Sequence, residues 1–110
     1  MRTVTRKHLL VVRGLAKFAQ VTVGRGEQSD GNPLAAPQIL LNDRPLPRLA
    51  DGDREILEAA LQGIRETEAL IGWQGPRHFV VAIEGLEVDE IDANAARLAA
   101  GLATRELIEQ

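Results

Sequence analysis

The stretch that decides the fold is ILEAALQGIRETEALIGW, residues 56–73. Its apolar residues recur with the spacing of one helix face, which predicts an amphipathic helix over about 53–71. Gly63 lies well inside that helix, where glycine costs roughly 1 kcal/mol relative to alanine. Its presence there requires a structural reason, and the neighbouring residues on the helix face provide one.

The helix face around Gly63 is unusually small in its middle. At about 3.6 residues per turn, one stripe of this face contains Ile56, Ala60, Gly63, Thr67 and Leu70, with Leu57, Ile64 and Ile71 beside it. A second helix, predicted over about 93–109, has small residues in a matching place: Ala96, Ala99, Ala100, Gly101 and Ala103. Helices with small residues where they cross can approach closely. Gly63 is therefore predicted to be a packing position between two helices, and a functional kink in the helix is the alternative.

The segments around this helix predict one α+β domain over residues 1–110. β-branched and apolar residues predict four strands, over 3–13, 18–23, 38–42 and 77–88. RGLAK (13–17) is predicted to join the first two strands, and the glycine- and proline-rich residues 24–37 predict a loop. The element order is β-β-β-α-β-α. It is typical of a four-stranded, mainly antiparallel sheet with two helices packed on one face.

Acidic residues and glycine set the predicted ends of both helices. Asp51 or Asp53 is predicted to cap the start of the first helix, and Gly72 to end it. Asp92 or Asn94 is predicted to cap the second helix. Short polar side chains at such positions accept hydrogen bonds from the free amides of the first turn.

Length and composition place the chain in the ordinary range of one globular domain. It has 110 residues, of which 45% are hydrophobic, and it has no cysteine, which excludes thiol chemistry. The apolar run Leu9–Val12 is too short for a signal peptide or a membrane span. A cytoplasmic location without membrane contact is therefore predicted.

Charge is divided unevenly along the chain. Residues 1–26 carry six basic side chains and no acid, whereas the remaining residues have a local balance of −9. A basic N-terminal surface for an anionic partner is one interpretation. The other is that basic residues on an exposed strand discourage edge-to-edge pairing.

Catalysis has no support in the sequence. His8 and His78 are the only histidines, and neither lies in a metal-binding or Ser-His-Asp pattern, so no enzyme activity, metal or cofactor is predicted. A solvated acidic turn that caps a helix, rather than a cation site, is predicted for Glu87, Asp89, Glu90 and Asp92. Trp73 is interpreted either as a buried anchor against the sheet or as an exposed platform for a base.

The segment LQGIRETEALIGW, followed by a strand, an acidic turn and an alanine-rich helix, resembles domain IV of elongation factor G. The ribosomal-protection proteins of the same superfamily have similar Gly-Ile-Arg and Gly-Trp sequences. The residues that match as structural markers are Gly63, Ile64, Arg65, Gly72 and Trp73. GLAKFAQVTV (14–23) resembles the glycine-rich hairpin of the family through Gly14, Lys17, Phe18, Ala19 and Val21. The resemblance covers nearly the whole chain, in the same order.

The resemblance implies a ribosomal protein S5 domain 2-like fold with a left-handed βαβ crossover. It also implies a ribosome or ribosomal RNA as partner. The chain departs from the family at the hairpin tip, where Ala16 replaces a second glycine, and in EGLEVDEID (84–92), which lacks an aromatic residue and a histidine. It contains no GTPase domain, so a separate translational GTPase is a further possible partner.

Two functional hypotheses follow. In the first, the chain is a non-catalytic, translation-factor-like domain that binds RNA or the ribosome through its basic N-terminal hairpin. The candidate contacts are Arg13, Gly14, Lys17, Phe18 and Arg25. In the second, it is a protein-interaction or homo-oligomeric assembly module, such as a homodimer, that kept the fold and lost the ribosomal role. The acidic C-terminal half and the altered loop tips favour the second hypothesis.

Overall fold

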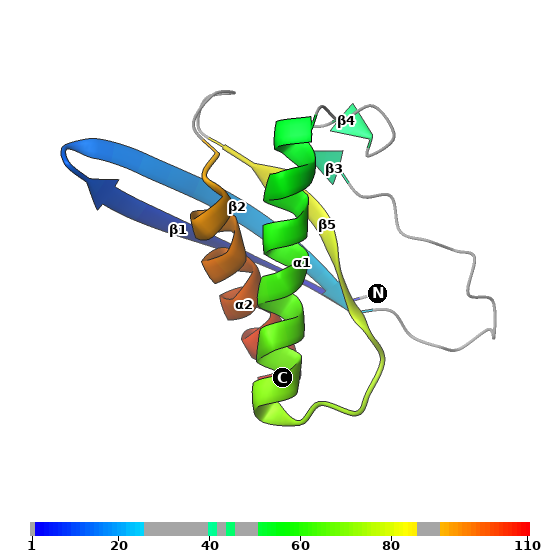
Figure 1. Cartoon of the computed structure of the whole chain (residues 1–110). Coiled ribbons are helices and arrows are strands. Elements are labelled where there is room, and N and C mark those ends of the chain that lie inside the picture. Colours follow the sequence, from blue (N-terminus) through cyan, green and yellow to red (C-terminus); the bar gives the residue numbers. More distant parts are fainter. Residues whose placement is uncertain (1, 26–39, 42–43, 46–50, 86–90) are drawn as a thin grey trace.

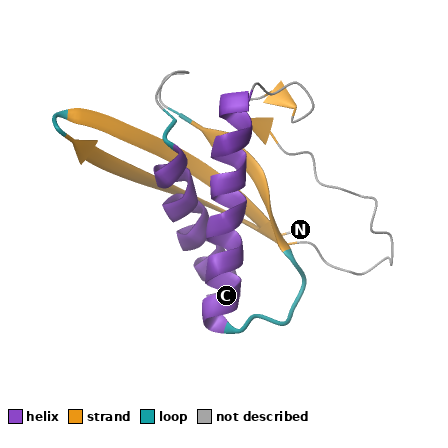
Figure 2. Cartoon of the chain, viewed as in Figure 1, coloured by secondary structure: helices purple, strands orange, loops and turns teal. Residues whose placement is uncertain are grey.

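A computed structural model describes residues 2–25, 40–41, 44–45, 51–85 and 91–110. The elements in chain order are β1 (Arg2–Val12), β2 (Leu15–Arg25), β3 (Leu40–Leu41), β4 (Arg44–Pro45), α1 (Asp51–Ile71), β5 (His78–Glu84) and α2 (Ala93–Glu109). The two helices lie side by side on one face of the sheet (Figures 1 and 2). The predicted α+β class with two helices packed against a sheet is confirmed.

Three long strands form the main sheet. β1 pairs with β2 and β2 with β5, both antiparallel. The predicted third strand over 38–42 lies partly outside the described residues. Its described part, Leu40–Leu41, pairs in parallel with Ala82 and Ile83 of β5, and β4 follows on the outer side. The sheet therefore consists of three long antiparallel strands with the two-residue strands β3 and β4 beside β5. A full fourth strand with a crossover of defined hand stays a prediction.

The β1–β2 hairpin is longer and tighter than predicted. Val12 pairs with Leu15, so only Arg13 and Gly14 form the loop, with φ angles of 53° and 77°. Two consecutive positive φ angles are the signature of the type I′ turn, whose twist matches that of paired strands. The predicted connection RGLAK was too long because this turn lets pairing begin at once. β2 also continues to Arg25, which shortens the predicted loop over 24–37.

The core lies between α2 and the sheet and between the two helices. Asp92 is the N-cap of α2, as predicted, and its Oδ2 accepts a hydrogen bond from the Ala95 amide at 3.0 Å. Five alanines of α2 are fully buried, which lets this helix lie close to the strands and to α1: Ala95, Ala96, Ala99, Ala100 and Ala103. The core cluster consists of Val4, Ala19, Val21, Val23, Leu57, Ala60, Ile64, Val80, Ile83, Ala95, Ala96, Ala99, Ala100, Ala103 and Leu107.

Gly63 lies where α1 and α2 touch. A Cβ atom at this residue would overlap the backbone carbonyl of Arg97. Next to it, the Thr67 hydroxyl donates a hydrogen bond to the Gly63 carbonyl at 2.8 Å and lies 3.5 Å from the Gly101 carbonyl oxygen. The prediction that Gly63 is a packing position is confirmed. The backbones of α1 and α2 are therefore in direct contact at Gly63.

The predicted small stripe is wrong at its C-terminal end. Leu70 is 88% exposed and Ile71 is 44% exposed, so neither side chain is buried between the helices. The helix period places Leu70 on the same face as Gly63, but α2 offers it no covering side chain.

The ends of α1 and β5 differ from prediction by a few residues. α1 begins at Asp51, so Asp53 lies inside the helix and is not its cap. The predicted end is confirmed: Gly72 has a φ of 77°, and its amide and that of Trp73 donate to the Glu68 carbonyl at 2.9 Å. β5 ends at Glu84, short of the predicted 88, and residues 86–90 lie outside the described residues.

Candidate functional site

Arg13 and Gly14 form the tip of the β1–β2 hairpin. The tip projects beyond the helices, so that its end is not covered by α1 or α2 (Figure 1). Both residues are exposed. The backbone of Arg13 has a left-handed conformation. Residues other than glycine, asparagine and aspartate adopt this conformation at a cost in free energy. A charged side chain is thus held at the exposed end of the hairpin.

Lys17 and Phe18 follow the tip on β2 and are engaged by the start of α2. Lys17 Nζ lies 3.7 Å from Asp92 Oδ1, the N-cap residue of α2. Phe18 is 8% exposed, and its carbonyl accepts a hydrogen bond from the Asp92 amide at 3.3 Å. The Phe18 ring is therefore buried and presents no free face for stacking.

Arg25 lies at the opposite end of the hairpin. It pairs with His78 across β2 and β5, and its guanidinium carbon is 5.7 Å from the centre of the Trp73 ring. Its Nη1 also donates to the Leu107 carbonyl at 3.5 Å. Twelve residues of extended chain separate Arg13 from Arg25, which corresponds to about 40 Å. The structure does not bring the five predicted contact residues to one place.

Acidic residues of α2 neutralise part of the hairpin's charge. Arg6 forms an ion pair with Glu106, and Lys17 with Asp92. Arg2, Lys7 and Arg13 are exposed and form no ion pair with a described residue. The basic residues of the hairpin that form no ion pair with a described residue therefore lie on β1, at the tip and, as Arg25, at the end of β2.

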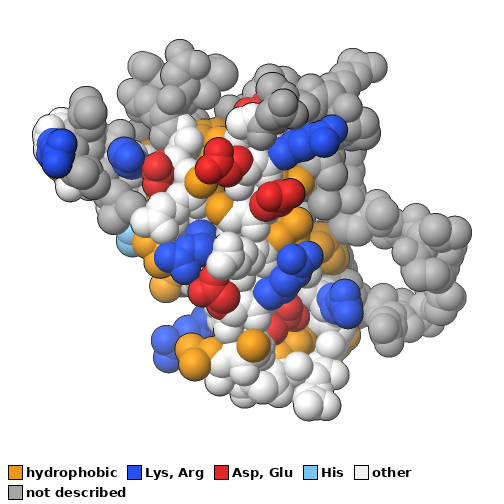
Figure 3. All heavy atoms as spheres, viewed as in Figure 1, with side chains coloured by type: hydrophobic (Ala, Val, Ile, Leu, Met, Phe, Trp, Pro, Cys, Tyr) orange, Lys and Arg blue, Asp and Glu red, His pale blue; other side chains and the backbone are white. Residues whose placement is uncertain are grey.

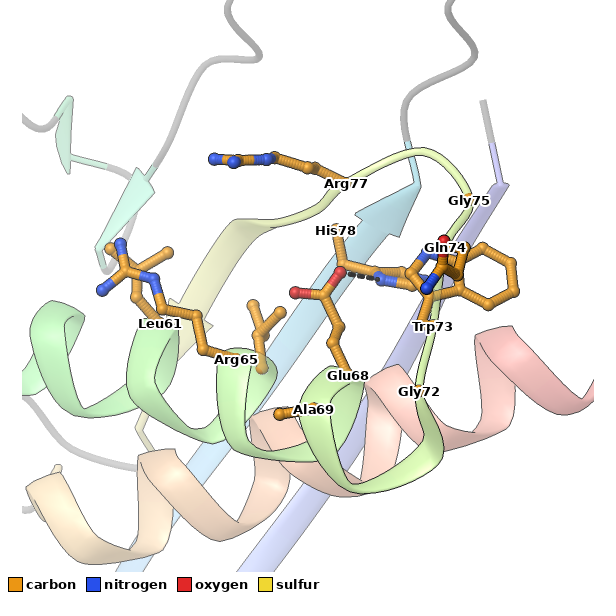
Figure 4. A pocket seen from close by; sticks show the side chains of 11 residues that line it. Leu61, Arg65, Glu68, Ala69, Gly72, Trp73, Gln74, Gly75, Arg77 and His78 are labelled. Carbon is orange, nitrogen blue, oxygen red and sulfur yellow. Dashed lines mark hydrogen bonds and ion pairs between the residues drawn. The ribbon is translucent and has the colours of Figure 1, made fainter.

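A cleft of about 620 Å³ lies beside the C-terminal half of α1 (Figure 4). It is bounded by α1, by the connection 72–77 and by the start of β5. Its lining residues are both polar and apolar and include three of the structural markers of the predicted family, Arg65, Gly72 and Trp73. Ile64 also reaches it from the core, whereas Gly63 belongs to the helix contact.

The floor of this cleft is a buried histidine bonded to a glutamate. The His78 side chain is fully buried, and its Nδ1 lies 3.0 Å from Glu68 Oε2. The Trp73 ring is tilted at 46° to the His78 ring with their centres 5.3 Å apart, and its Nε1 donates to the Pro76 carbonyl at 2.8 Å. Trp73 is thus a partly buried anchor that fixes its own loop.

Sequence reasoning missed the His78–Glu68 contact. Ten residues separate the two, and only the return of the chain after Gly72 brings them together. One signal was available: Glu68 lies in the last turn of the predicted helix, and His78 opens the next strand after a short connection.

Elsewhere the helix face carries both signs of charge close together (Figure 3). Arg97 donates to both oxygens of Glu66, and Arg105 pairs with Glu109. Among the described residues, no group of three or more His, Asp or Glu side chains is placed to hold a metal ion. In the same part of the chain, neither helix is long and apolar enough to cross a membrane.

Comparison with known proteins adds no family to this geometry. The chain matches no protein-family model, and a search of curated proteins finds no match either.

Proposed function

We propose that the chain is a non-catalytic, translation-factor-like domain that binds RNA or the ribosome through its basic N-terminal hairpin. The observation that carries this proposal is the tip itself. Arg13 is exposed there and has a positive φ. The hairpin lies within the first 26 residues of the chain, which contain six basic side chains and no acid. RNA binding is supported by such unpaired cations, because neutralising backbone phosphates releases counterions.

The choice of residue at the tip also favours function over stability. A type I′ turn prefers Asn-Gly, because asparagine tolerates positive φ. Arginine at the first turn position gives up part of that stability and supplies a long, permanently charged side chain instead. Lys7 and Arg2 add charge along the same edge strand.

Arg13→Asn separates the two roles of the tip. We expect the free energy of unfolding of this variant to be about 0.5–1 kcal/mol higher than that of the parent, because asparagine tolerates the positive φ of this turn position better than arginine does. We expect it to bind RNA more weakly, with the slope of log K against log salt reduced by about 1. Urea unfolding and co-sedimentation with ribosomes over a range of salt concentrations measure the two effects.

Arg54→Gln is the matched control for charge. Arg54 is an exposed cation on α1, away from the hairpin, and its loss should leave the salt slope unchanged. Ribosome co-sedimentation that is equal in the parent, Arg13→Asn and a double variant with Lys7→Gln would rule out the hairpin as the RNA contact.

The finer assignments of fold and partner belong to the same proposal. We infer a ribosomal protein S5 domain 2-like fold with a left-handed crossover and a relationship to domain IV of elongation factor G. Support comes from Gly63 at the helix contact, from Gly72 at the end of α1 and from the element order. A ribosome-binding role places the chain in the cytoplasm, where a translational GTPase is a candidate partner.

A second function is favoured by one specific observation. β1 is an edge strand of the sheet that the described residues form, and two of its apolar residues, Leu9 and Val11, are 56% and 69% exposed. An unpaired edge with exposed apolar side chains can pair with another strand. An assembly module, in which two copies join through β1, is therefore the alternative to RNA binding.

The variant Leu9→Glu with Val11→Glu tests the assembly function. If two copies pair through β1, the parent sediments as a dimer in high salt and the double variant as a monomer, because four charges would meet at the joint. Gln62→Glu, at an exposed position of α1 and off β1, serves as a control for added charge. A parent that is monomeric at all concentrations reached by analytical ultracentrifugation excludes this alternative.

A further inference from the structure

We propose that the cleft beside Trp73 is a binding site for a phosphate group, held between Arg65 and Arg77. The site is separate from the hairpin tip, because the cleft lies at the end of the sheet where Arg25 pairs with His78. It does not depend on the function proposed for the hairpin.

The first argument is the pair of unpaired guanidinium groups. Arg65 comes from α1 and Arg77 from the connection before β5, and both line the cleft. Figure 4 shows both side chains reaching out on the side of the cleft away from Trp73. Both are exposed, and neither forms an ion pair with a described residue. Each guanidinium group is planar and can donate two parallel hydrogen bonds, which matches the arrangement of oxygen atoms in a phosphate group.

The second argument is the state of the acid in the cleft. Glu68 is the one carboxylate among the lining residues, and its Oε2 is already bonded to the buried Nδ1 of His78. The carboxylate is therefore held at the floor of the cleft through one oxygen, and its other oxygen lies on the side of Arg65 and Arg77 (Figure 4). Two positive charges face one engaged negative charge, so the opening attracts an anion.

The third argument is that the wall of the cleft is fixed before any ligand binds. The Trp73 indole donates to the Pro76 carbonyl, and a Cβ at Gly75 would overlap the Trp73 ring. Gly72 closes α1 through its left-handed conformation. A preformed wall lowers the ordering cost of binding.

The ligand is identified by its phosphate chemistry and has two sources. The cleft volume of about 620 Å³ is larger than one phosphate ion and falls in the range of small-molecule sites. It can take free inorganic phosphate or the terminal phosphate of a nucleotide chain. The indole is occupied by its own loop, by Arg25 and by His78, so a base would extend past Arg65 and Arg77 rather than stack on Trp73.

Trp73 makes the test direct, because it is the only tryptophan of the chain and lines the cleft. The full chain is titrated at constant ionic strength with inorganic phosphate, and in a second arm with a 5′-phosphorylated trinucleotide, while indole fluorescence is recorded. We expect a saturable change in at least one arm. Arg65→Gln and Arg77→Gln should each raise the dissociation constant at least tenfold. The arm with the lower dissociation constant identifies the source of the phosphate.

Two variants serve as controls. Arg54→Gln removes an exposed α1 arginine that does not line the cleft, and Arg13→Asn removes the tip cation. Both should bind phosphate like the parent, and far-ultraviolet circular dichroism verifies that each variant is folded. No saturable change in either arm, or saturation that survives Arg65→Gln and Arg77→Gln unaltered, overturns the site. Because Arg13→Asn tests the hairpin separately, either proposal can fail while the other holds.

Discussion

Gly63→Ala is expected to lower the free energy of unfolding by about 2–3 kcal/mol. In an isolated helix this substitution would stabilise by roughly 1 kcal/mol, because alanine is the better helix former. Here the new methyl group meets the Arg97 carbonyl, which belongs to the backbone of α2 and cannot rotate away. The helices must separate, and the alanine packing between them loosens. Urea unfolding followed by circular dichroism measures the change.

The same helix offers a matched control. Gly52 lies in the first turn of α1, and a Cβ added there meets nothing within 4 Å. Gly52→Ala should therefore leave stability unchanged or raise it by a few tenths of a kcal/mol up to about 1. If Gly63→Ala proved as stable as Gly52→Ala, the close contact of the two helices would be wrong.

Leu107→Ala has the second large expected effect, a loss of about 2–5 kcal/mol in the free energy of unfolding. Leu107 is fully buried in the last turns of α2 and belongs to the core between the helices and the sheet. Its truncation removes apolar contacts and leaves a cavity that the neighbouring strands cannot fill without moving. Chemical unfolding with a fitted slope separates this loss from a change in the denatured state.

Leu102→Ala is the control for the chemical change. It lies on the same helix and makes the same replacement, but Leu102 is 48% exposed. Its expected cost is at most about 1 kcal/mol, since much of the side chain is already in water. Equal losses for Leu102→Ala and Leu107→Ala would contradict the orientation of α2 on the sheet.

The two proposed anion contacts lie at opposite ends of the hairpin. Arg13 marks the exposed tip, and Arg65 and Arg77 line the cleft at the end where β2 meets β5. About 40 Å of extended strand separates the two ends. A single phosphate group cannot contact both, which is why the variants at Arg13 and at Arg65 are expected to act independently.

Local sequence signals predicted the elements of this fold well. Asp92 as a helix cap, Gly72 as a helix end and Gly63 at a helix contact all follow from residues within a few positions of each other. The hairpin was predicted, but its tight turn was not, because arginine is an unusual first residue of a type I′ turn. Leu70 has the right period for the helix contact and is still exposed.

The candidate sites were predicted less well. Phe18 was among the predicted RNA contacts, yet it is buried and bridged to Ile91 by backbone pairing. Arg25 was grouped with Arg13 because both belong to the basic N-terminal segment, although they lie at opposite ends of the hairpin. Proximity in sequence is a poor guide to proximity in space along an extended strand.

The sequence by itself determined where the helices and long strands lie and that glycine would stand between the helices. Those features depend on periodicity, capping and side-chain size, which are local properties of the chain. Only the tertiary structure decided that His78 is buried against Glu68 and that Arg65 and Arg77 share one cleft. The reason is physical: those contacts depend on how α1 and β5 pack after the chain reverses at Gly72, and no local pattern specifies that packing.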